Sequence, residues 1–279
     1  MNLHAAFFAR QAQIPWWNQD AIQSKHVLIL GVGGIGSHVA VACGRLGVGQ
    51  VTLVDYDRVE ASNLNRQVLY MPSDVGKEKA AAALNALQFH SLGTDVHAHN
   101  FDIFEQWQDT CSFILQADFV INSLDLPEVK RLLVASACVG LAKPMIYAGT
   151  DVVHGTAGMV LFQPPGGQPC YECLQATRFS VKSEEWVQLA PAHVLQEESV
   201  NYEDLVAEHV EFPNAATNIV IAGAVSNVAA MEMVKYFHGM PVANRIILDL
   251  FNFTLESFVL EGDAECIVCG QGQEVESKK

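Results

Sequence analysis

The sequence predicts an α/β protein built on a doubly wound, mostly parallel β-sheet. Two observations carry this prediction. A glycine-rich turn joins a short apolar segment to a helical one, and apolar and helical segments then alternate regularly as far as residue 150. A strand, a glycine turn, a helix and a second strand in this order open a doubly wound sheet.

The elements of the first half follow one another closely. The apolar run His26–Leu30 predicts a strand that ends in the turn Gly31-Val32-Gly33-Gly34-Ile35-Gly36, and a helical pattern continues to Leu46. A second strand is expected at residues 51–55. Further along, the pattern predicts a helix at 77–89, a strand near Val96, a strand at 118–122, a helix at 127–139 and a strand at 144–148.

The second half is less regular. A strand is expected at 158–163, a long helix at Ile219–Phe237, and two strands at 245–250 and 253–259. Between them, residues 174–214 lack strong periodicity, and the stretch 184–211 carries eight acidic residues and no Lys or Arg. We find no linker composition, so we predict a single domain over 1–279. It consists of an N-terminal arm (1–25), a nucleotide-binding half (26–150) and an acidic insertion (174–214).

Composition argues against two classes of partner. The net charge of −15, from 16 Lys+Arg against 31 Asp+Glu, repels a nucleic-acid backbone, so we expect no DNA or RNA partner. No uninterrupted apolar run reaches the roughly 18 residues of a membrane span, and the longest candidate, which starts at Ile219, is broken by Asn227 and Glu232. We therefore expect a buried helix there, no membrane partner, no secretory signal and a cytoplasmic location.

The glycine turn is a candidate nucleotide site. Glycines let the backbone approach phosphates, and the N-terminus of the following helix supplies N–H donors and a favourable dipole. Asp55 lies at the end of the next predicted strand, where a carboxylate can accept hydrogen bonds from ribose hydroxyls. The candidate turn residues are Gly31, Gly33, Gly34 and Gly36. These features suit ATP and NAD equally, so an NAD-dependent oxidoreductase stays open at this point.

Four further motifs distinguish the two cofactors. They are Asp55-Tyr56-Asp57, Asn63-Leu64-Asn65-Arg66-Gln67, Gly76-Lys77-Glu78-Lys79 and Asn122-Ser123-Leu124-Asp125. This ordered set resembles the ubiquitin-activating (E1-like) superfamily, which includes the adenylating enzymes of molybdopterin and thiamine sulfur carriers, over residues 10–269. The resemblance implies an E1-like adenylation domain with antiparallel C-terminal strands. It also implies an enzyme that uses ATP and Mg²⁺ to convert a carboxylate into an acyl-AMP with release of pyrophosphate. An NAD-dependent enzyme leaves the cations and the last aspartate of these motifs without a role.

The resemblance also implies roles for individual residues. Arg10, Arg66, Lys79 and Asp125 are expected to be catalytic, with Asp125 binding Mg²⁺ and Arg10 reaching the ATP of a second protomer in a homodimer. The expected nucleotide-binding side chains, besides the glycines, are those of Asp55, Asp57, Asn63, Arg66, Gln67 and Lys79. The expected substrate is the C-terminal tail of a ubiquitin-like or sulfur-carrier protein, or a peptide precursor. A catalytically inactive scaffold subunit is a further alternative, but it does not explain why the phosphate and metal residues are present.

Two Cys-x-x-Cys pairs, Cys170/Cys173 and Cys266/Cys269, predict a structural zinc site. The alternatives are a redox pair or unrelated thiols. The other cysteines, Cys43, Cys111 and Cys138, fall in or beside predicted helices and are expected in the core. None lies in residues 174–214, where ubiquitin-type activators carry the cysteine that forms a thioester. We therefore expect a member that stops at the acyl-adenylate.

Overall fold

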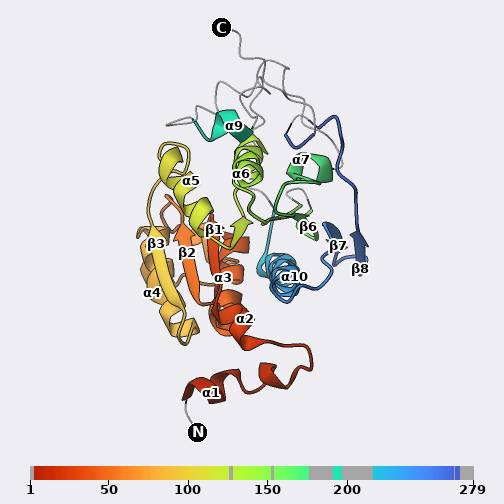
Figure 1. Cartoon of the computed structure of the whole chain (residues 1–279). Helices are drawn as coiled ribbons and strands as arrows, with labels where there is room; N and C mark the ends of the chain where they lie inside the picture. Colours follow the sequence, from red (N-terminus) through yellow and green to blue (C-terminus); the bar gives the residue numbers. More distant parts are fainter. Residues whose placement is uncertain are drawn as a thin grey trace.

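The named strands form one eight-stranded sheet in the order β3-β2-β1-β4-β5-β6-β7-β8 (Figure 1). The structure is a computed structural model that describes residues 3–125, 128–151, 154–175, 191–196, 216–266 and 268–270. The five strands of the first half run parallel: β1 (His26–Leu30), β2 (Gln50–Val54), β3 (Asp95–His99), β4 (Phe119–Asn122) and β5 (Met145–Thr150). The sheet continues antiparallel through β6 (Ala157–Gln163), β7 (Arg245–Asp249) and β8 (Thr254–Phe258).

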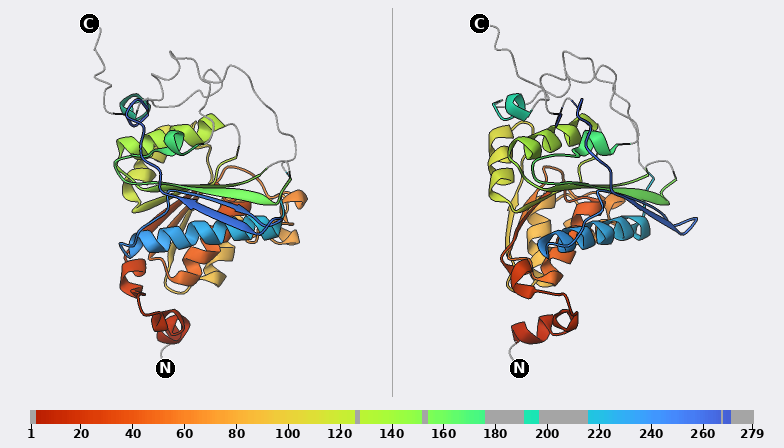
Figure 2. Two further views of the ribbon diagram at one scale, coloured as in Figure 1. Left: turned by 90° about the vertical axis from the view of Figure 1, so that its right-hand side faces the viewer. Right: turned by 45° about the vertical axis from the view of Figure 1, so that its right-hand side comes forward.

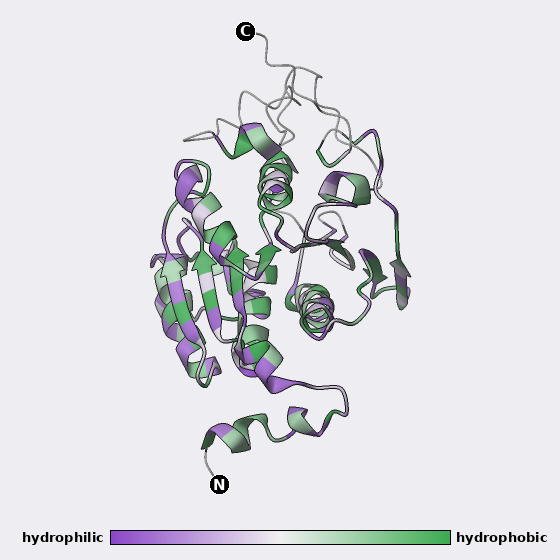
Figure 3. Ribbon diagram, viewed as in Figure 1, coloured by the Kyte–Doolittle hydropathy of each residue, from purple (hydrophilic) through white to green (hydrophobic). Residues whose placement is uncertain are grey.

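Helices cover both faces of the parallel half (Figure 2). One face carries α3 (Gly34–Leu46), α4 (Lys79–His90) and α10 (Ile219–Phe237), and the other carries α5 (Trp107–Gln116) and α6 (Glu128–Gly140). The central strands β1, β2 and β4 are accordingly hydrophobic, as their mainly green colour in Figure 3 shows. Near-continuous apolar strands are typical of a parallel sheet that is buried on both faces.

Shorter helices complete the described chain. They are α1 (Leu3–Phe8), α2 (Gln19–Gln23), α7 (Tyr171–Leu174) and α9 (Pro191–Val194), with 3-10 turns at Gln11–Gln13, Ala61–Asn63 and Pro72–Asp74. The N-terminal arm with α1 lies beyond the amino ends of the strands, at the bottom of Figure 1. There the Nε2 atom of Gln11 donates a hydrogen bond to the carbonyl of Leu46 over 3.0 Å.

The long apolar helix α10 belongs to the core. It has the length and apolar composition of a membrane-spanning helix, but half of its apolar stretch is buried inside the fold. It packs along α3, where the hydroxyl of Ser226 donates to the carbonyl of Ile35 over 3.1 Å. The expectation of a buried helix is therefore confirmed.

The predicted fold class and the element order are confirmed. The ends of the predicted strands and helices fall within two residues of the observed ones. Helix α5 was not predicted, although its buried residues Trp107, Thr110, Cys111 and Ile114 follow the i, i+3, i+4, i+7 spacing of an amphipathic helix. Most of the acidic insertion predicted at 174–214 lies outside the described residues.

Candidate functional site

The glycine turn brings the backbone of β1 close to the start of α3. Gly31 adopts a left-handed conformation, with φ of 84°, that favours glycine. A Cβ atom on Gly36 would lie 1.9 Å from the carbonyl oxygen of Gly31, so no larger residue fits there without a shift of the backbone. The hydroxyl of Ser123, just after β4, donates to the Gly31 carbonyl over 2.7 Å and fixes the turn from the other side. The N-terminus of α3 is thereby presented at the carboxyl edge of the sheet.

A cavity of about 130 Å³ opens at this edge, and we call it the nucleotide cavity. Its lining comes from the glycine turn, from the residues that follow β2, β3 and β4, and from the first turns of α4 and α6. The charged or amide side chains among the lining residues are those of Asp55, Asp57, Gln67, Lys79, Asp102, Asp125 and Lys130. Ligands of open α/β sheets bind at the carboxyl ends of the strands, so this is the expected place for a nucleotide.

Asp55 lines the cavity with a carboxylate that is fixed by two backbone hydrogen bonds. Its carboxylate accepts hydrogen bonds from the backbone N–H of Val32 over 2.7 Å and of Asp57 over 2.9 Å. Burial raises the pKa of Asp55, while the charge of Lys79 and the two N–H donors act in the opposite direction. The carboxylate thus ties the glycine turn to the end of β2.

Lys79, the first residue of α4, has its charge engaged by a neighbouring acid. Its Nζ atom lies 2.8 Å from Oδ2 of Asp57, and the lysine side chain is 8% exposed whereas that of Asp57 is 48% exposed. The backbone N–H of Lys79 also donates to the Asp57 carbonyl over 2.9 Å. A phosphate that enters the cavity can therefore share or replace the exposed carboxylate as the partner of a buried ammonium group.

A second cavity, of about 80 Å³, adjoins the first on the β5 side. Its lining includes Gly34, Arg66 and Arg131 together with residues of β5. The two cavities share five lining residues: Gly33, Gln67, Ser123, Leu124 and Asp125. The exposed carboxylate of Asp125 therefore borders both spaces.

Gln67 marks the junction of the two cavities. The residue is 3% exposed, and its buried Oε1 atom has no hydrogen-bond partner among the described residues. A buried amide oxygen without a partner is costly, and a bound ligand or water with a donor group relieves that cost. Arg66 lies beside it with the aliphatic part of its side chain over Gly34, and its Nη1 atom donates to the carbonyl of Ser62 over 2.9 Å.

Arg131 is a site residue that the sequence analysis missed. Its Nε atom donates to the carbonyl of Leu124 over 3.0 Å, and its guanidinium lies 4.7 Å from the centre of the Tyr147 ring. Burial acts to lower the pKa of Arg131, but Tyr147, Tyr171 and Asp125 outweigh it and raise the pKa, so the group stays charged. The available signal was the pair Lys130-Arg131, five and six residues after Asp125, at the start of a helix whose later residues are mostly apolar.

Three of the described residues predicted for the nucleotide site line neither cavity: Gly36, Asn63 and Arg10. The carboxamide oxygen of Asn63 accepts a hydrogen bond from the backbone of Glu60 over 3.1 Å, and Asn63 is not among the described residues that line either cavity. Arg10 is exposed and lies between α1 and Gln11, in the arm beyond the amino ends of the strands. Its own cavity is at the opposite edge of the sheet. The other predicted residues meet at the carboxyl edge, and all the individual roles stay predictions.

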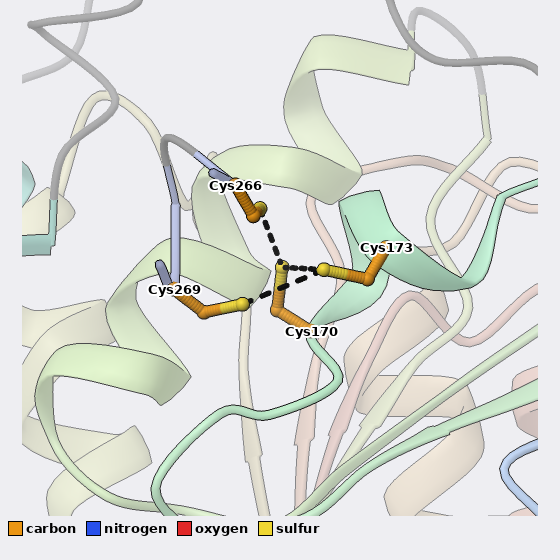
Figure 4. Close-up of side chains that lie close together, drawn as sticks. All are labelled: Cys170, Cys173, Cys266 and Cys269. Carbon is orange, nitrogen blue, oxygen red and sulfur yellow. Dashed lines mark hydrogen bonds between the residues drawn. The ribbon is translucent and has the colours of Figure 1, made fainter. Parts of the chain in front are cut away.

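The four paired cysteines converge in one cluster (Figure 4). Their Sγ atoms all lie within 4.8 Å of one another, with separations of 3.9 Å for Cys170–Cys173, 3.7 Å for Cys170–Cys266 and 3.5 Å for Cys173–Cys269. Four sulfurs bound tetrahedrally at about 2.3 Å from zinc are about 3.8 Å apart. Hydrogen bonding among the four thiols lowers the pKa of Cys173 and Cys266 and raises the pKa of Cys170 and Cys269. The cluster therefore fits zinc in geometry and in ligand type.

The chain belongs to the ThiF family, whose model matches residues 7–268. It is 26% identical over 259 residues to molybdopterin-synthase adenylyltransferase of Escherichia coli, covering 91% of this chain and 90% of that protein. It is 24% identical over 270 residues to adenylyltransferase and sulfurtransferase MOCS3 of Arabidopsis thaliana, covering 94% of this chain and 52% of the relative. The chain thus spans about half the length of the second protein.

Solved structures of E. coli MccB share the fold. One, solved without a named ligand, superposes with a TM-score of 0.75 at 24% identity and covers 98% of this chain and 74% of that chain. Another, solved with ATP, superposes with a TM-score of 0.67 at 25% identity and covers 90% of this chain and 68% of that chain. The expected superfamily and its mixed sheet with antiparallel C-terminal strands are therefore confirmed.

Proposed function

We propose that this chain uses ATP to adenylate the carboxylate of a protein or peptide tail. One observation carries the proposal: the nucleotide cavity and the second cavity meet at shared residues, with Asp125 bordering both. A nucleotide in the first space and a carboxylate in the second are then neighbours at this junction. Family membership confirms the enzyme class, an E1-like adenylyltransferase, and removes the support for an NAD-dependent oxidoreductase.

The reaction joins a carboxylate oxygen to the α-phosphorus of ATP and breaks the bond from that phosphorus to the bridging oxygen of pyrophosphate. No general base is required, because a carboxylate is already ionised near neutral pH. Negative charge grows on the phosphate oxygens, so fixed N–H donors and cations lower the barrier. We assign this work to the N-terminus of α3, Lys79 and Arg66, with Asp55 holding the ribose.

Asp125 is the residue we assign to Mg²⁺. Its exposed carboxylate follows β4 and borders both cavities, and Mg²⁺ in such sites is bound by one or two carboxylates together with substrate phosphates. When bound, the ion neutralises charge on the phosphates. Arg131 supports this loop by its hydrogen bond to the carbonyl of Leu124, directly before Asp125.

The second cavity is the expected path for the substrate tail. Arg66 and Arg131 line it and offer cationic groups to a carboxylate. The E. coli relative is named for molybdopterin synthase, and MccB has been solved with the peptide MccA. These relatives support a carrier-protein tail or a peptide precursor as the substrate. The sequence has no cysteine at 174–214, so the product we propose is the acyl-AMP itself.

We also propose a homodimer in which Arg10 serves the partner's site, because the N-terminal arm that carries this residue lies beyond the amino ends of the strands, opposite the cavity of its own chain. Mixing inactive Arg10→Ala and Lys79→Met protomers tests this arrangement. Each mixed dimer then has one intact site, and activity returns to roughly a quarter of the wild-type value. No recovery on mixing contradicts a role across the dimer.

The four-cysteine cluster is assigned to a zinc ion of structural role. Four protein ligands leave no open position for chemistry. The ion would link the start of α7 to the segment at Cys266 and Cys269, which lies 96 residues further along the chain.

Pyrophosphate–ATP exchange tests the adenylation directly, with Gly-Gly-ended carrier proteins and tail peptides as candidate substrates. We expect exchange that requires substrate and falls at least about 100-fold in Asp125→Ala. Asp20→Ala is the matched control, since Asp20 is an exposed aspartate in α2 near the amino edge of the sheet. Exchange that survives in Asp125→Ala, or a wild-type protein that fails to bind Mg-ATP, contradicts the proposal.

A further inference from the structure

The strand order determines in which sequence the lining segments follow one another along the nucleotide cavity. The cavity runs along the carboxyl edge from the glycine turn after β1, past Asp55 after β2, to residues 101–104 after β3. These three strands are neighbours in the order β3-β2-β1. A nucleotide with its phosphates at the turn and its ribose at Asp55 therefore places its base over the segment that follows β3.

This end of the cavity has one fixed aromatic wall. Phe104 is 3% exposed, and its ring stacks on that of Trp107 at 5.8 Å between centroids and 8° between planes. Trp107 is in turn anchored, because its Nε1 atom donates to the carbonyl of Val194 over 2.7 Å. Tyr56, directly after Asp55, lines the same end and is 53% exposed. A planar base can stack on the exposed ring of Tyr56, while the buried Phe104 closes this end of the cavity.

Lys130, in the first turn of α6, lies over both rings. Its Nζ atom is 5.2 Å from the centre of the Phe104 ring and 6.0 Å from that of Tyr56, and the residue lines the cavity. An ammonium group has three donors and no acceptor, so it pairs with acceptor atoms only. Adenine offers acceptors at its ring nitrogens N1, N3 and N7. The ammonium can therefore pair with the edge of such a base, and the rings can pack against the base itself.

We propose that Lys130 recognises the nucleobase, donating a hydrogen bond to one ring nitrogen of adenine while the base packs against Phe104 and Tyr56. The inference rests on the proposed function only in taking ATP as the nucleotide. Lys130 then sets the affinity for the base and takes no part in the chemistry at the phosphate. In the nucleotide-free protein the two rings hold the ammonium in place by cation–π contacts.

The test is direct binding of ATP, measured by calorimetry without a carboxylate substrate. A hydrogen bond from a charged donor predicts that Lys130→Met weakens ATP binding by roughly 10-fold or more, and that Lys130→Arg retains most of the affinity. Lys25→Met is the matched control, because Lys25 makes a cation–π contact with Phe237 at 6.0 Å near the amino edge of the sheet. The melting temperature of each variant shows whether the fold is kept.

Three analogues of ATP sharpen the test: 1-deaza-, 3-deaza- and 7-deaza-ATP, each lacking one ring nitrogen. We expect the wild type to bind one of them about 10-fold more weakly than ATP, and Lys130→Met to bind that analogue and ATP equally. The inference is overturned if Lys130→Met binds ATP as the wild type does, or if it keeps the wild-type preference among the analogues. A wild type that binds no ATP at all refutes the proposed function instead.

Discussion

The cysteine cluster and the nucleotide cavity are both built to hold a charged ligand, but they differ in how complete they are. In the cysteine cluster, four thiols from two distant segments already lie within 4.8 Å of one another. In the nucleotide cavity, Lys79 is paired with Asp57 at 2.8 Å, and the N-terminal arm that carries Arg10 lies beyond the amino ends of the strands. A structural site keeps one geometry throughout, whereas a site that turns substrate over needs groups whose partners can be exchanged. This difference predicts which changes affect stability and which affect activity.

Loss of the metal is expected to have the largest effect, and the effect falls on stability. Cys266→Ser should remove the zinc and cost roughly 3–5 kcal/mol, lowering Tm by about 10 °C, because the link between α7 and the C-terminal segment is lost. Metal analysis and thermal unfolding measure both consequences. Cys111→Ser is the control, since Cys111 is a core cysteine outside the cluster. A wild-type protein without bound zinc contradicts the assignment.

Lys79→Met is expected to act on activity instead. Removal of the buried ammonium should lower pyrophosphate exchange by about 100-fold, because a fixed cation that stabilises the negative charge developing on the phosphate oxygens is lost. Lys77→Met offers a closely matched control. That lysine is 59% exposed and pairs with Asp74 at 2.9 Å, and it does not line the nucleotide cavity. An equal loss of exchange in the two variants would show that the effect is not specific to the cavity.

Two glycine substitutions test whether close packing of the backbone at the turn is what requires glycine. Gly36→Ala should cost about 1–3 kcal/mol and weaken ATP binding, because the new methyl group overlaps the Gly31 carbonyl. In Gly34→Ala the nearest atom is 3.5 Å away, on the flexible side chain of Arg66. That variant should keep wild-type stability. Thermal unfolding of the pair checks this, and similar losses in both argue against close packing at Gly36 as the cause.

Trp107→Phe should have the smallest effect. It removes the buried hydrogen bond to the Val194 carbonyl but keeps an aromatic ring beside Phe104, so we expect a loss of about 1 kcal/mol. Denaturant unfolding measures this loss. An unchanged free energy of unfolding would mean that α9 is held by its packing alone.

Sequence order was enough to predict which residues gather at the carboxyl edge of the sheet. In a doubly wound sheet, residues after β1, β2 and β4 must come together, so Gly33, Asp55 and Asp125 could be grouped before their distances were known. Paired Cys-x-x-Cys motifs likewise predicted the convergence of thiols 96 residues apart. In the first case a rule of topology fixes which residues are neighbours, and in the second the spacing typical of metal ligands indicates them.

Other features depended on packing that no local pattern contains. Lys130 and Arg131 are adjacent on α6, yet one reaches the aromatic rings of the nucleotide cavity and the other the ring of Tyr147. Only the orientation of that helix on the sheet decides which lysine or arginine enters which space. The pairing of Lys79 with Asp57 is also a tertiary feature, since the two residues are 22 positions apart.

The border that Asp125 forms between the two cavities has a consequence for inhibitor design. A non-hydrolysable mimic of an acyl-adenylate, such as an acyl sulfamate of adenosine, spans both spaces in one molecule. Joining the two halves makes the second binding event intramolecular, which can raise affinity by on the order of 10²–10⁴ over either half. In a series of such compounds with different acyl groups, the acyl group that binds most tightly would indicate the natural substrate tail.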